Sequence, residues 1–414
     1  MTTGHETIFS NPFRPGAGHM PPYVAGRTKE QSEFRKLLTQ EIILENLVLT
    51  GLRGVGKTVL LETFKPLAMQ DGWLWVGDDL SEAASISEER ISIRLLTDLA
   101  VITSSIVVDR QNVPRFGFEK TEDIDEVRLD FPFMSEMYKN TPGLVSDKLK
   151  AILEFVWSCM RGQSPKGLIF AYDEAQNLAD HAAKEQYPLS LMLDVFQSIQ
   201  KKKIPFMLAL TGLPTLFPKL VEARTFSERM FHIIFLDRLA PSDSKEAITK
   251  PIKDSKCPVI LSKQMINSIV DLSGGYPYFI QFLGREVYDV AIRKVDGKKN
   301  DSLPNNIPIP FNDIVRKLDS DFFAGRWARA TDRQRHLLTV IAHLENADAE
   351  FTVQEISEKS KEFIKNPFSP SHANQLLAKL SDMGLVYKNR HGKYSFAVPL
   401  LGRFIMRQQS EAIK

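Results

Sequence analysis

The residues best suited to chemistry lie in a glycine-rich stretch that ends in a Lys-Thr pair. The stretch matches the phosphate-binding pattern G-x-x-x-x-G-K-[ST] at every position and consists of Gly51, Leu52, Arg53, Gly54, Val55, Gly56, Lys57 and Thr58, followed by Val59. Glycines let backbone N–H groups approach phosphate oxygens without a Cβ in the way. Lys57 is placed to reach the β- and γ-phosphates, and the Thr58 hydroxyl is placed to bind Mg²⁺. This P-loop pattern predicts a nucleoside triphosphate site.

The elements around this loop are those that a phosphate site requires. An apolar run at 46–50 predicts a buried strand before the loop, and a helical pattern from about 57 to 70 follows it. The helix offers unpaired N–H groups and the positive end of its dipole to an anion. The alternative is an ordinary glycine-rich turn before a core helix. The coincidence of strand, spacing, Lys-Thr pair and apolar helix favours the phosphate site.

A second apolar run, at 167–172, ends in the paired carboxylates Asp173 and Glu174. Such a run is typical of a buried parallel strand that delivers side chains at its carboxyl end. In a triphosphate site the first acid organises the Mg²⁺ shell, which assigns that task to Asp173. Glu174 is then placed to polarise the attacking water as general base. The alternative is a strand that ends at an acidic loop.

Three further runs predict the rest of the sheet: 73–77, 205–212 and 231–236. They alternate with helical patterns, and this alternation predicts an α/β fold with a parallel, doubly covered sheet. The run at 205–212 ends with the hydroxyl residue Thr211. The segment 109–144, rich in turn residues and charge, is left unassigned between a functional loop and a hairpin.

Length and composition limit the other possibilities. The chain has 414 residues, 43% of them hydrophobic and 25% charged, as expected of a globular protein with two or three domains. A net charge of +2 does not by itself indicate nucleic-acid binding. Cys159 and Cys257 lack metal-ligand spacing and fit a reducing compartment. The run at 95–108 is interrupted by Asp98, so we expect a cytoplasmic protein without a membrane span.

Breaks in the pattern divide the chain into five parts. We expect a Pro/Gly-rich arm, an α/β nucleotide-binding core, a helical lid, a linker and a C-terminal domain, at residues 1–26, 27–240, 241–300, 301–329 and 330–414. The arm is either disordered or packed on the next domain through Phe13, Tyr23 and Val24.

The C-terminal part has the order helix, helix, helix, hairpin. Helical patterns start at Thr331, near Phe351 and at Ser369, and two short strands flank a turn at 389–393. This is the order of a winged helix, a variant of the helix-turn-helix.

Taken together, these stretches resemble AAA+ ATPases, particularly the origin-recognition and archaeal initiator branch and related bacterial ATPases. The resemblance is carried by Gly26-Arg27 with Glu30, the P-loop, Asp173-Glu174 and Thr211. It implies ATP and Mg²⁺ as ligands and ATP hydrolysis as the activity. It also implies that Thr211 links the γ-phosphate to the attacking water and that the segment around Arg27 lies against the adenine. A surface role for Arg27 is the alternative.

The resemblance also implies an arginine finger and a DNA-binding surface. Arg229, just before the last strand, lies where the family often places an arginine that reaches a neighbouring subunit's ATP, and Arg224 is the competing candidate. Duplex DNA would bind through 371–393, with the helix at 371–383 in the major groove. The residues concerned are Asn374 and Gln375 for bases and Lys388, Arg390, His391 and Lys393 for phosphates. The alternative is a protein-contact module, because Lys379 is the only lysine or arginine in that helix.

One departure from the family lies in the lid. Initiator ATPases usually carry an arginine where this chain reads Gly274-Gly275-Tyr276-Pro277. A Gly-Gly-x-Pro lid is similar to that of STAND signalling ATPases, which implies that Pro277 packs near the adenine; Arg285 is a weak substitute for the missing arginine. The departure favours slow turnover and a switch.

Three functions therefore stay open. The first is an ATP-hydrolysing switch or motor, acting as a homo-oligomer on DNA or on a DNA-bound partner. The second is a STAND-like signalling or defence ATPase that gates an effector protein without touching DNA. The third is a nucleotide-binding scaffold that hardly hydrolyses ATP.

Overall fold

The computed structural model describes residues 10–16, 18–113, 123–255, 259–295, 308–390 and 392–412. The chain forms two compact units, each with its own hydrophobic core. We call them the sheet unit (Thr28–Thr50 and Leu60–Phe235) and the lid unit (Met1–Arg27, Gly51–Val59 and Leu236–Lys414).

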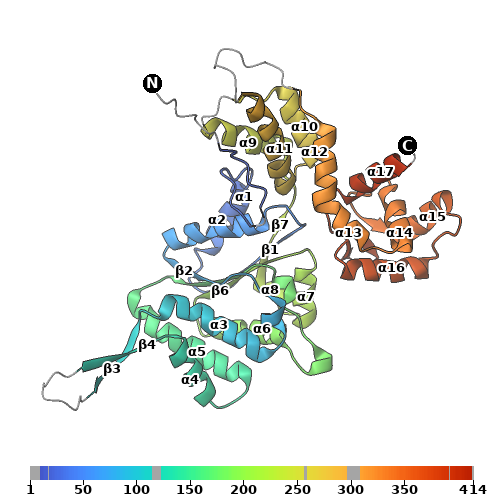
Figure 1. The fold of residues 1–414 in the computed structure, drawn as a ribbon. Coiled ribbons are helices and arrows are strands. Elements are labelled where there is room, and N and C mark those ends of the chain that lie inside the picture. The colour runs from blue at the N-terminus through green and yellow to red at the C-terminus, as the bar shows by residue number, and fades with distance from the viewer. Residues whose placement is uncertain are drawn as a thin grey trace, which may run out of the picture. The chain divides into compact units, whose positions relative to one another are not determined.

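The sheet unit is built on a five-stranded sheet of order β2-β5-β6-β1-β7 (Figure 1). The strands are β1 (Asn46–Gly51), β2 (Trp73–Val76), β5 (Gly167–Tyr172), β6 (Phe206–Gly212) and β7 (Phe231–Leu236). The pairs β2–β5, β5–β6 and β6–β1 are parallel. Every residue of β1, β5 and β6 is buried, which explains their continuous apolar sequences. The α/β fold with a parallel central sheet is confirmed.

Helices cover both faces of this sheet. Two of them, α1 (Thr28–Leu37) and α2 (Lys57–Gln70), lie on one face, where Phe34 and Phe64 stack with ring centroids 4.2 Å apart. The opposite face carries α3 (Glu88–Thr103), α5 (Val145–Met160) and α6 (Pro188–Lys201). Shorter elements complete the unit: η1 (Glu82–Ser85), η2 (Arg161–Gln163), η3 (Ala175–Asn177), η4 (Ala182–Lys184), α7 (Leu216–Ala223) and α8 (Ser227–Met230).

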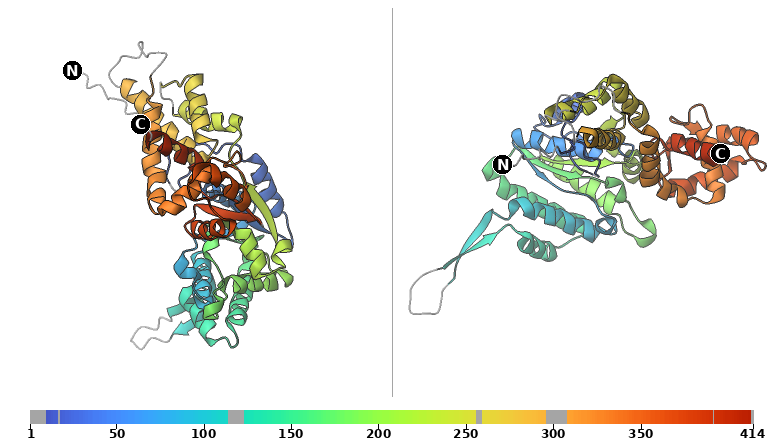
Figure 2. Two further views of the ribbon diagram at one scale, coloured as in Figure 1. Left: turned by 90° about the vertical axis from the view of Figure 1, so that its right-hand side faces the viewer. Right: turned by 45° about the horizontal axis from the view of Figure 1, so that its top comes forward.

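The segment that the sequence leaves unassigned contains a hairpin and a helix. Strands β3 (Val107–Val113) and β4 (Asp123–Arg128) pair antiparallel, and α4 (Phe131–Asn140) follows them. Figure 2 shows the two strands extending away from the helices of the sheet unit. Glu122 of the charged run lies outside the described residues.

The lid is a three-helix group in the lid unit, formed by α9 (Pro241–Asp254), α10 (Lys263–Ser273) and α11 (Pro277–Val295). The Ser262 side chain caps α10 by accepting a hydrogen bond from the Met265 N–H. Gly274, with φ of 58°, ends that helix in the left-handed conformation that glycine adopts without strain. The three helices lie within residues 241–300, where the sequence predicts a helical lid.

Part of the stretch that the sequence treats as a linker is helical. It contains α12 (Phe311–Leu318), the π-helical segment η6 (Asp319–Ala324) and α13 (Gly325–Ala328). Phe323 of η6 is fully buried and stacks on Phe404, so this segment packs into the C-terminal domain.

The C-terminal domain has the predicted order of elements. They are α14 (Asp332–Ala342), β8 (Phe351–Thr352), α15 (Val353–Phe363), α16 (Pro370–Asp382), β9 (Val386–Arg390), β10 (Lys393–Phe396) and α17 (Leu401–Ala412). Strands β8, β10 and β9 form an antiparallel sheet in that order. Within the described ranges, no helix is long and apolar enough to cross a membrane.

Candidate functional site

The P-loop has the backbone that its glycines predict. Gly54 and Gly56 have φ angles of 78° and 91°, which lie in the left-handed region that residues with a Cβ rarely adopt. The Lys57 ammonium donates to the carbonyls of Gly51 and Leu52, each at 3.0 Å, and therefore lies over its own loop.

The lid contacts the P-loop directly at the start of α11. The Tyr278 N–H donates to the Gly54 carbonyl at 3.1 Å. A Cβ at Gly54 would lie 3.1 Å from the Tyr278 Cβ, and one at Gly56 would lie 3.8 Å from the Pro277 Cγ. At Gly54 a Cβ would be crowded by Tyr278, whereas at Gly56 it would make an ordinary van der Waals contact with Pro277. Pro277 therefore lies at the P-loop.

Arg27 supports the P-loop from the N-terminal arm. Its side chain is only 7% exposed, and Nη2 donates to the Val55 carbonyl at 3.0 Å and to the Asp237 carbonyl at 2.8 Å. The preceding Gly26, with φ of 63°, lies so close to α9 that a Cβ there would be 2.5 Å from an Asp243 carboxylate oxygen. Arg27 is thus a buried residue that braces the loop, and not a surface residue.

The arm itself is ordered on the lid. Phe13 is buried against α11, with its ring 6.2 Å from that of Tyr288, and it occupies the space that a side chain at Gly284 would fill. Asn11 donates to the Arg285 carbonyl at 3.0 Å and to the Asp289 carboxylate at 2.7 Å. Of the two expectations for the arm, the packed one describes these residues.

The sheet unit presents the acidic pair at the end of β5. Asp173 is 5% exposed, and one of its carboxylate oxygens accepts the Glu174 N–H at 2.7 Å. Glu174 is exposed and has a left-handed φ of 51°, which is uncommon for a residue with a Cβ. The Asp173 backbone is also fixed, because its carbonyl accepts the Leu80 N–H at 2.9 Å. The two carboxylates therefore have different environments, one buried and one open.

Gln176 is a site residue that sequence reasoning missed. Its Nε2 donates to the Glu174 carboxylate, and its Oε1 accepts the Leu213 N–H at 3.0 Å, just after β6. The Gln176 carbonyl accepts a hydrogen bond from the Lys219 ammonium at 3.0 Å. Gln176 therefore ties the predicted general base to the end of the neighbouring strand. The signal was a polar residue two positions after the acid, which the pattern alone does not distinguish from a loop residue.

Two hydroxyl groups near the strand ends are buried without a partner. Thr211 lies opposite Leu49 in the β1–β6 register, and Thr50 lies opposite Gly212. Both Oγ1 atoms are buried and make no hydrogen bond. A buried hydroxyl normally has a partner, so these two are suited to a polar ligand at this edge of the sheet. The catalytic role of Thr211 stays a prediction.

The acidic edge carries closely spaced negative charge. Burial raises the pKa of the Asp79 carboxyl above its ordinary value, and the charges of Asp78 and Glu174 raise it further. Among the described residues, no group of three or more His, Cys, Asp or Glu side chains could hold a metal ion alone. A Mg²⁺ ion at such a site normally takes one or two protein oxygens and completes its shell with phosphate oxygens and water. Asp173 carries carboxylate oxygens of the required kind.

The two candidate arginine fingers differ in their surroundings. Arg224 forms a bidentate ion pair with Asp194, at 2.8 Å and 2.7 Å, and also donates to the Ser190 hydroxyl at 2.8 Å. Its hydrogen bonds to Asp194 raise the pKa of the guanidinium. Arg229 lies exposed in α8 at the start of β7. Arg224 would have to break a strong pair to reach another molecule, whereas Arg229 would not.

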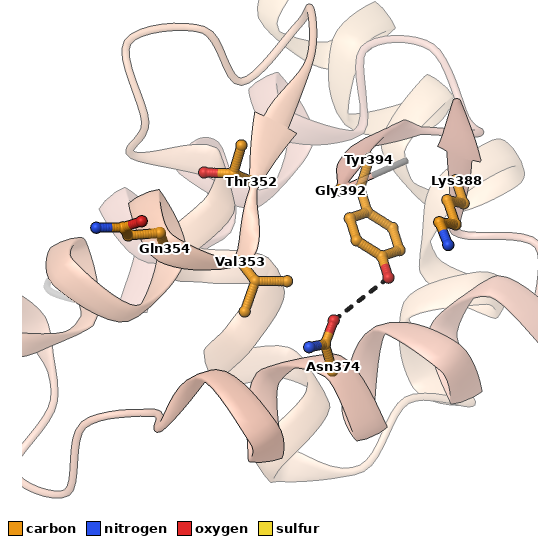
Figure 3. Close-up of a pocket in the computed structure, with 7 residues that line it drawn as sticks. All are labelled: Thr352, Val353, Gln354, Asn374, Lys388, Gly392 and Tyr394. Atoms are coloured by element: carbon orange, nitrogen blue, oxygen red, sulfur yellow. Dashed lines mark hydrogen bonds between the residues drawn. The ribbon is translucent and has the colours of Figure 1, made fainter. Parts of the chain in front are cut away.

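The C-terminal domain contains a hollow of about 410 Å³. Figure 3 shows that it lies between the start of α15, helix α16 and the β9–β10 hairpin. Its lining residues are Thr352, Val353, Gln354, Asn374, Lys388, Gly392 and Tyr394. The Tyr394 hydroxyl donates weakly to the Asn374 side chain at 3.4 Å. The structure thus brings together one residue predicted to read bases, Asn374, and one predicted to contact phosphate, Lys388.

The other residues predicted to contact DNA are only partly placed. Gln375 and Lys379 are exposed on α16, and Lys393 is half-buried at the start of β10. His391 lies outside the described residues, and the side chain of Arg390 is likewise not described.

The fold is similar to those of several solved proteins. A Walker-type ATPase of Pyrococcus abyssi is 15% identical, with a TM-score of 0.55 over 92% of this chain and 96% of that chain. The ORC2 protein of Aeropyrum pernix in its ADP form is also 15% identical, with a TM-score of 0.54 over 96% of each chain. Its ADPNP-ADP complexes are 13% identical, with a TM-score of 0.51 over 96% of this chain and 98% of that chain.

These likenesses show that the chain shares the fold of the Walker-type ATPase and of ORC2, in agreement with the fold predicted from the sequence. Residues 320–405 also match a family described as a domain of unknown function (DUF8462). No curated protein is similar in sequence to this chain.

Proposed function

We propose that this protein is an ATP-binding and ATP-hydrolysing switch that acts on DNA, or on a DNA-bound partner, through its C-terminal domain. The observation that carries the proposal is the contact between the lid and the P-loop. The Tyr278 N–H donates to the Gly54 carbonyl, and Pro277 lies at Gly56. A nucleotide that binds at the loop would therefore affect the position of the lid. The fold of known ATPases supports the same reading.

The residues have distinct roles in the proposed reaction. Lys57 and the loop amides hold the β- and γ-phosphates, and Arg27 keeps the loop in shape. Mg²⁺, when bound by Thr58 and Asp173, supplies charge neutralisation at the phosphates. Glu174 accepts the proton of the attacking water, and Gln176 orients its carboxylate. We also propose that Pro277 borders the adenine and that Arg229 reaches a neighbouring subunit.

The chemistry is tested by replacing Glu174 with Gln, which keeps the shape of the side chain and removes the base. We expect nucleotide binding to persist and phosphate release to fall by about 10²-fold or more. Glu185→Gln is a matched control, because Glu185 is also exposed and also has a left-handed φ, of 52°. If Glu174→Gln hydrolyses ATP at the rate of Glu185→Gln, the protein is not the ATPase proposed.

The proposal for DNA rests on the hollow beside α16. Asn374 carries the amide that suits a base edge, and Lys388 a cation for phosphate. Replacing Lys388 with Gln should weaken duplex binding for every sequence and lower the slope of log affinity against log salt by about one. Lys361→Gln, at the far end of α15, is the control.

The second candidate is a STAND-like switch that gates an effector protein. It is favoured by two observations: the Gly-Gly-Tyr-Pro turn lies at the P-loop, and Lys379 is the only lysine or arginine of α16. Duplex binding that is absent, or that does not change with salt while ATP is bound, would exclude direct DNA recognition and leave this candidate.

A further inference from the structure

Three arginines from separate parts of the lid unit lie near one another beside the P-loop. Arg53 belongs to the loop, Arg326 to α13, and Arg329 follows α13. The Arg53 Nη2 lies 3.8 Å from the position that a Cβ would take at Gly384, and the Arg329 Nη2 donates to the Met383 carbonyl at 3.3 Å. Both therefore reach the turn between α16 and β9.

Arg326 is joined to the P-loop through aromatic rings. Its guanidinium lies 4.5 Å from the centroid of the Phe322 ring and donates to the Phe322 carbonyl. The Phe322 ring lies 5.2 Å from the ring of Tyr278, whose N–H holds the Gly54 carbonyl. Two residues, Phe322 and Tyr278, thus connect Arg326 to the backbone of the P-loop.

The charge of this cluster is not balanced by acids. In the described part of the chain, none of the three guanidiniums pairs with a carboxylate. Asp321 is within electrostatic range of Tyr278 but makes no ion pair with the cluster. Burial lowers the pKa of Arg326, and the charges of Arg53 and Arg329 lower it further. Positive charges that lie close together without a counter-charge repel one another. A bound anion would therefore stabilise the cluster.

The chemistry of the cluster indicates a phosphate group. Arginine binds phosphate oxygens through parallel N–H donors, and several arginines together neutralise a doubly charged terminal phosphate better than lysines do. Arg53 is itself a residue of the phosphate-binding loop. The anion that would bind closest to the cluster is therefore the terminal phosphate of a nucleotide bound at this loop. The turn at Gly274–Pro277 lacks the arginine that could do this from the lid.

We propose that Arg53, Arg326 and Arg329 bind the terminal phosphate of the triphosphate and thereby fasten the α16–β9 turn to the P-loop. The inference rests on the proposed binding of ATP and adds to it the route by which the C-terminal domain detects the nucleotide state. With a diphosphate, the three charges repel and the turn at Met383 and Gly384 is held less firmly. Since α16 is the helix proposed to face DNA, the terminal phosphate would control the presentation of that helix.

The test compares a non-hydrolysable ATP analogue with ADP by calorimetry on the full chain. We expect wild type to prefer the analogue, and Arg326→Met to lose about tenfold or more of the analogue's affinity while ADP affinity stays within about twofold. Arg316→Met is the matched control, because Arg316 lies one helix earlier and pairs with Asp313. Failure of wild type to bind either nucleotide contradicts the proposed function itself. Normal wild-type binding with an unchanged preference in Arg326→Met contradicts only the inference.

A second measurement follows the turn itself. Hydrogen exchange of the amides at Met383 and Gly384 should be slower with the analogue than with ADP, and Arg329→Met should abolish the difference. Adding inorganic phosphate to the ADP complex distinguishes the source of the anion. If inorganic phosphate restores the protection of these amides, the site binds phosphate in general, including the released product. If only the analogue protects them, the site is specific for the nucleotide. Exchange that is equal in all three states overturns the proposal.

Discussion

Replacing Arg27 with Met tests whether the arm shapes the P-loop. The substitution keeps a long apolar stem but removes the guanidinium whose Nη2 donates to the Val55 and Asp237 carbonyls. Both acceptors lie around a side chain that is 7% exposed, so water cannot easily replace the donor. The two carbonyls would be left without this partner, and the Val55 peptide would be free to rotate.

The expected free-energy cost of Arg27→Met follows from the two hydrogen bonds that it removes. A hydrogen bond from a charged donor contributes about 1.5–3 kcal/mol, so losing both should cost about 3 kcal/mol or more. About 1.4 kcal/mol is a tenfold change in an equilibrium constant. If most of the loss is expressed as disorder of the loop, the Kd for ATP should rise about ten- to a hundredfold. The unfolding midpoint should also fall.

The assay is calorimetric titration of ATP, preceded by circular dichroism to show that the variant is folded. Arg14→Met is the matched control, because Arg14 belongs to the same arm but has an exposed side chain. We expect the control to bind ATP as wild type does. A folded Arg27→Met protein with the Kd of the control would refute the reasoning, because the two carbonyl contacts would then be irrelevant to the shape of the loop.

Three shorter predictions concern other contacts. Gln176→Leu should lower kcat about tenfold with little change in KM, since the Glu174 carboxylate loses its orienting donor, and steady-state kinetics will show whether KM changes instead. Phe13→Ala, which removes a buried anchor of the arm, should expose residues 10–26 to protease, whereas Tyr23→Phe should not. Burial raises the pKa of Tyr138 to about 12, above its ordinary value of 10.0, so its contribution to stability is present below pH 10 and is lost as pH rises toward 12. In urea unfolding across that range, Tyr138→Phe should lose less stability than wild type, and parallel curves would contradict the prediction.

The central sheet follows from the sequence because buried parallel strands leave a local trace. Residues 167–172 and 206–212 are apolar without interruption since both faces of their strands are covered. The P-loop is equally visible, because its glycines and its Lys-Thr pair are adjacent in the chain. Local patterns thus predict the strands and the loop that follows the first of them.

The residues that brace the site cannot be recognised from local sequence patterns. Arg27 meets the Asp237 carbonyl 210 positions away, and Asn11 meets Asp289 278 positions away. Nothing near Arg27 distinguishes a buried brace from a surface cation. The choice between Arg224 and Arg229 has the same character, because it depends on Asp194, 30 residues from Arg224, which fixes one of the two side chains and not the other.

The carbonyl groups of the P-loop would couple the lid to the proposed nucleotide. In a trans peptide the C=O and N–H point in opposite directions, so carbonyls held on one side of a loop leave amides for the other. Here the Lys57 ammonium, the Tyr278 N–H and Arg27 hold carbonyls of the loop. Moving the lid away breaks the bond to Gly54 and releases one of those peptides. A nucleotide that requires the loop in this shape therefore favours the docked lid, and by linkage the docked lid favours the nucleotide by the same free energy.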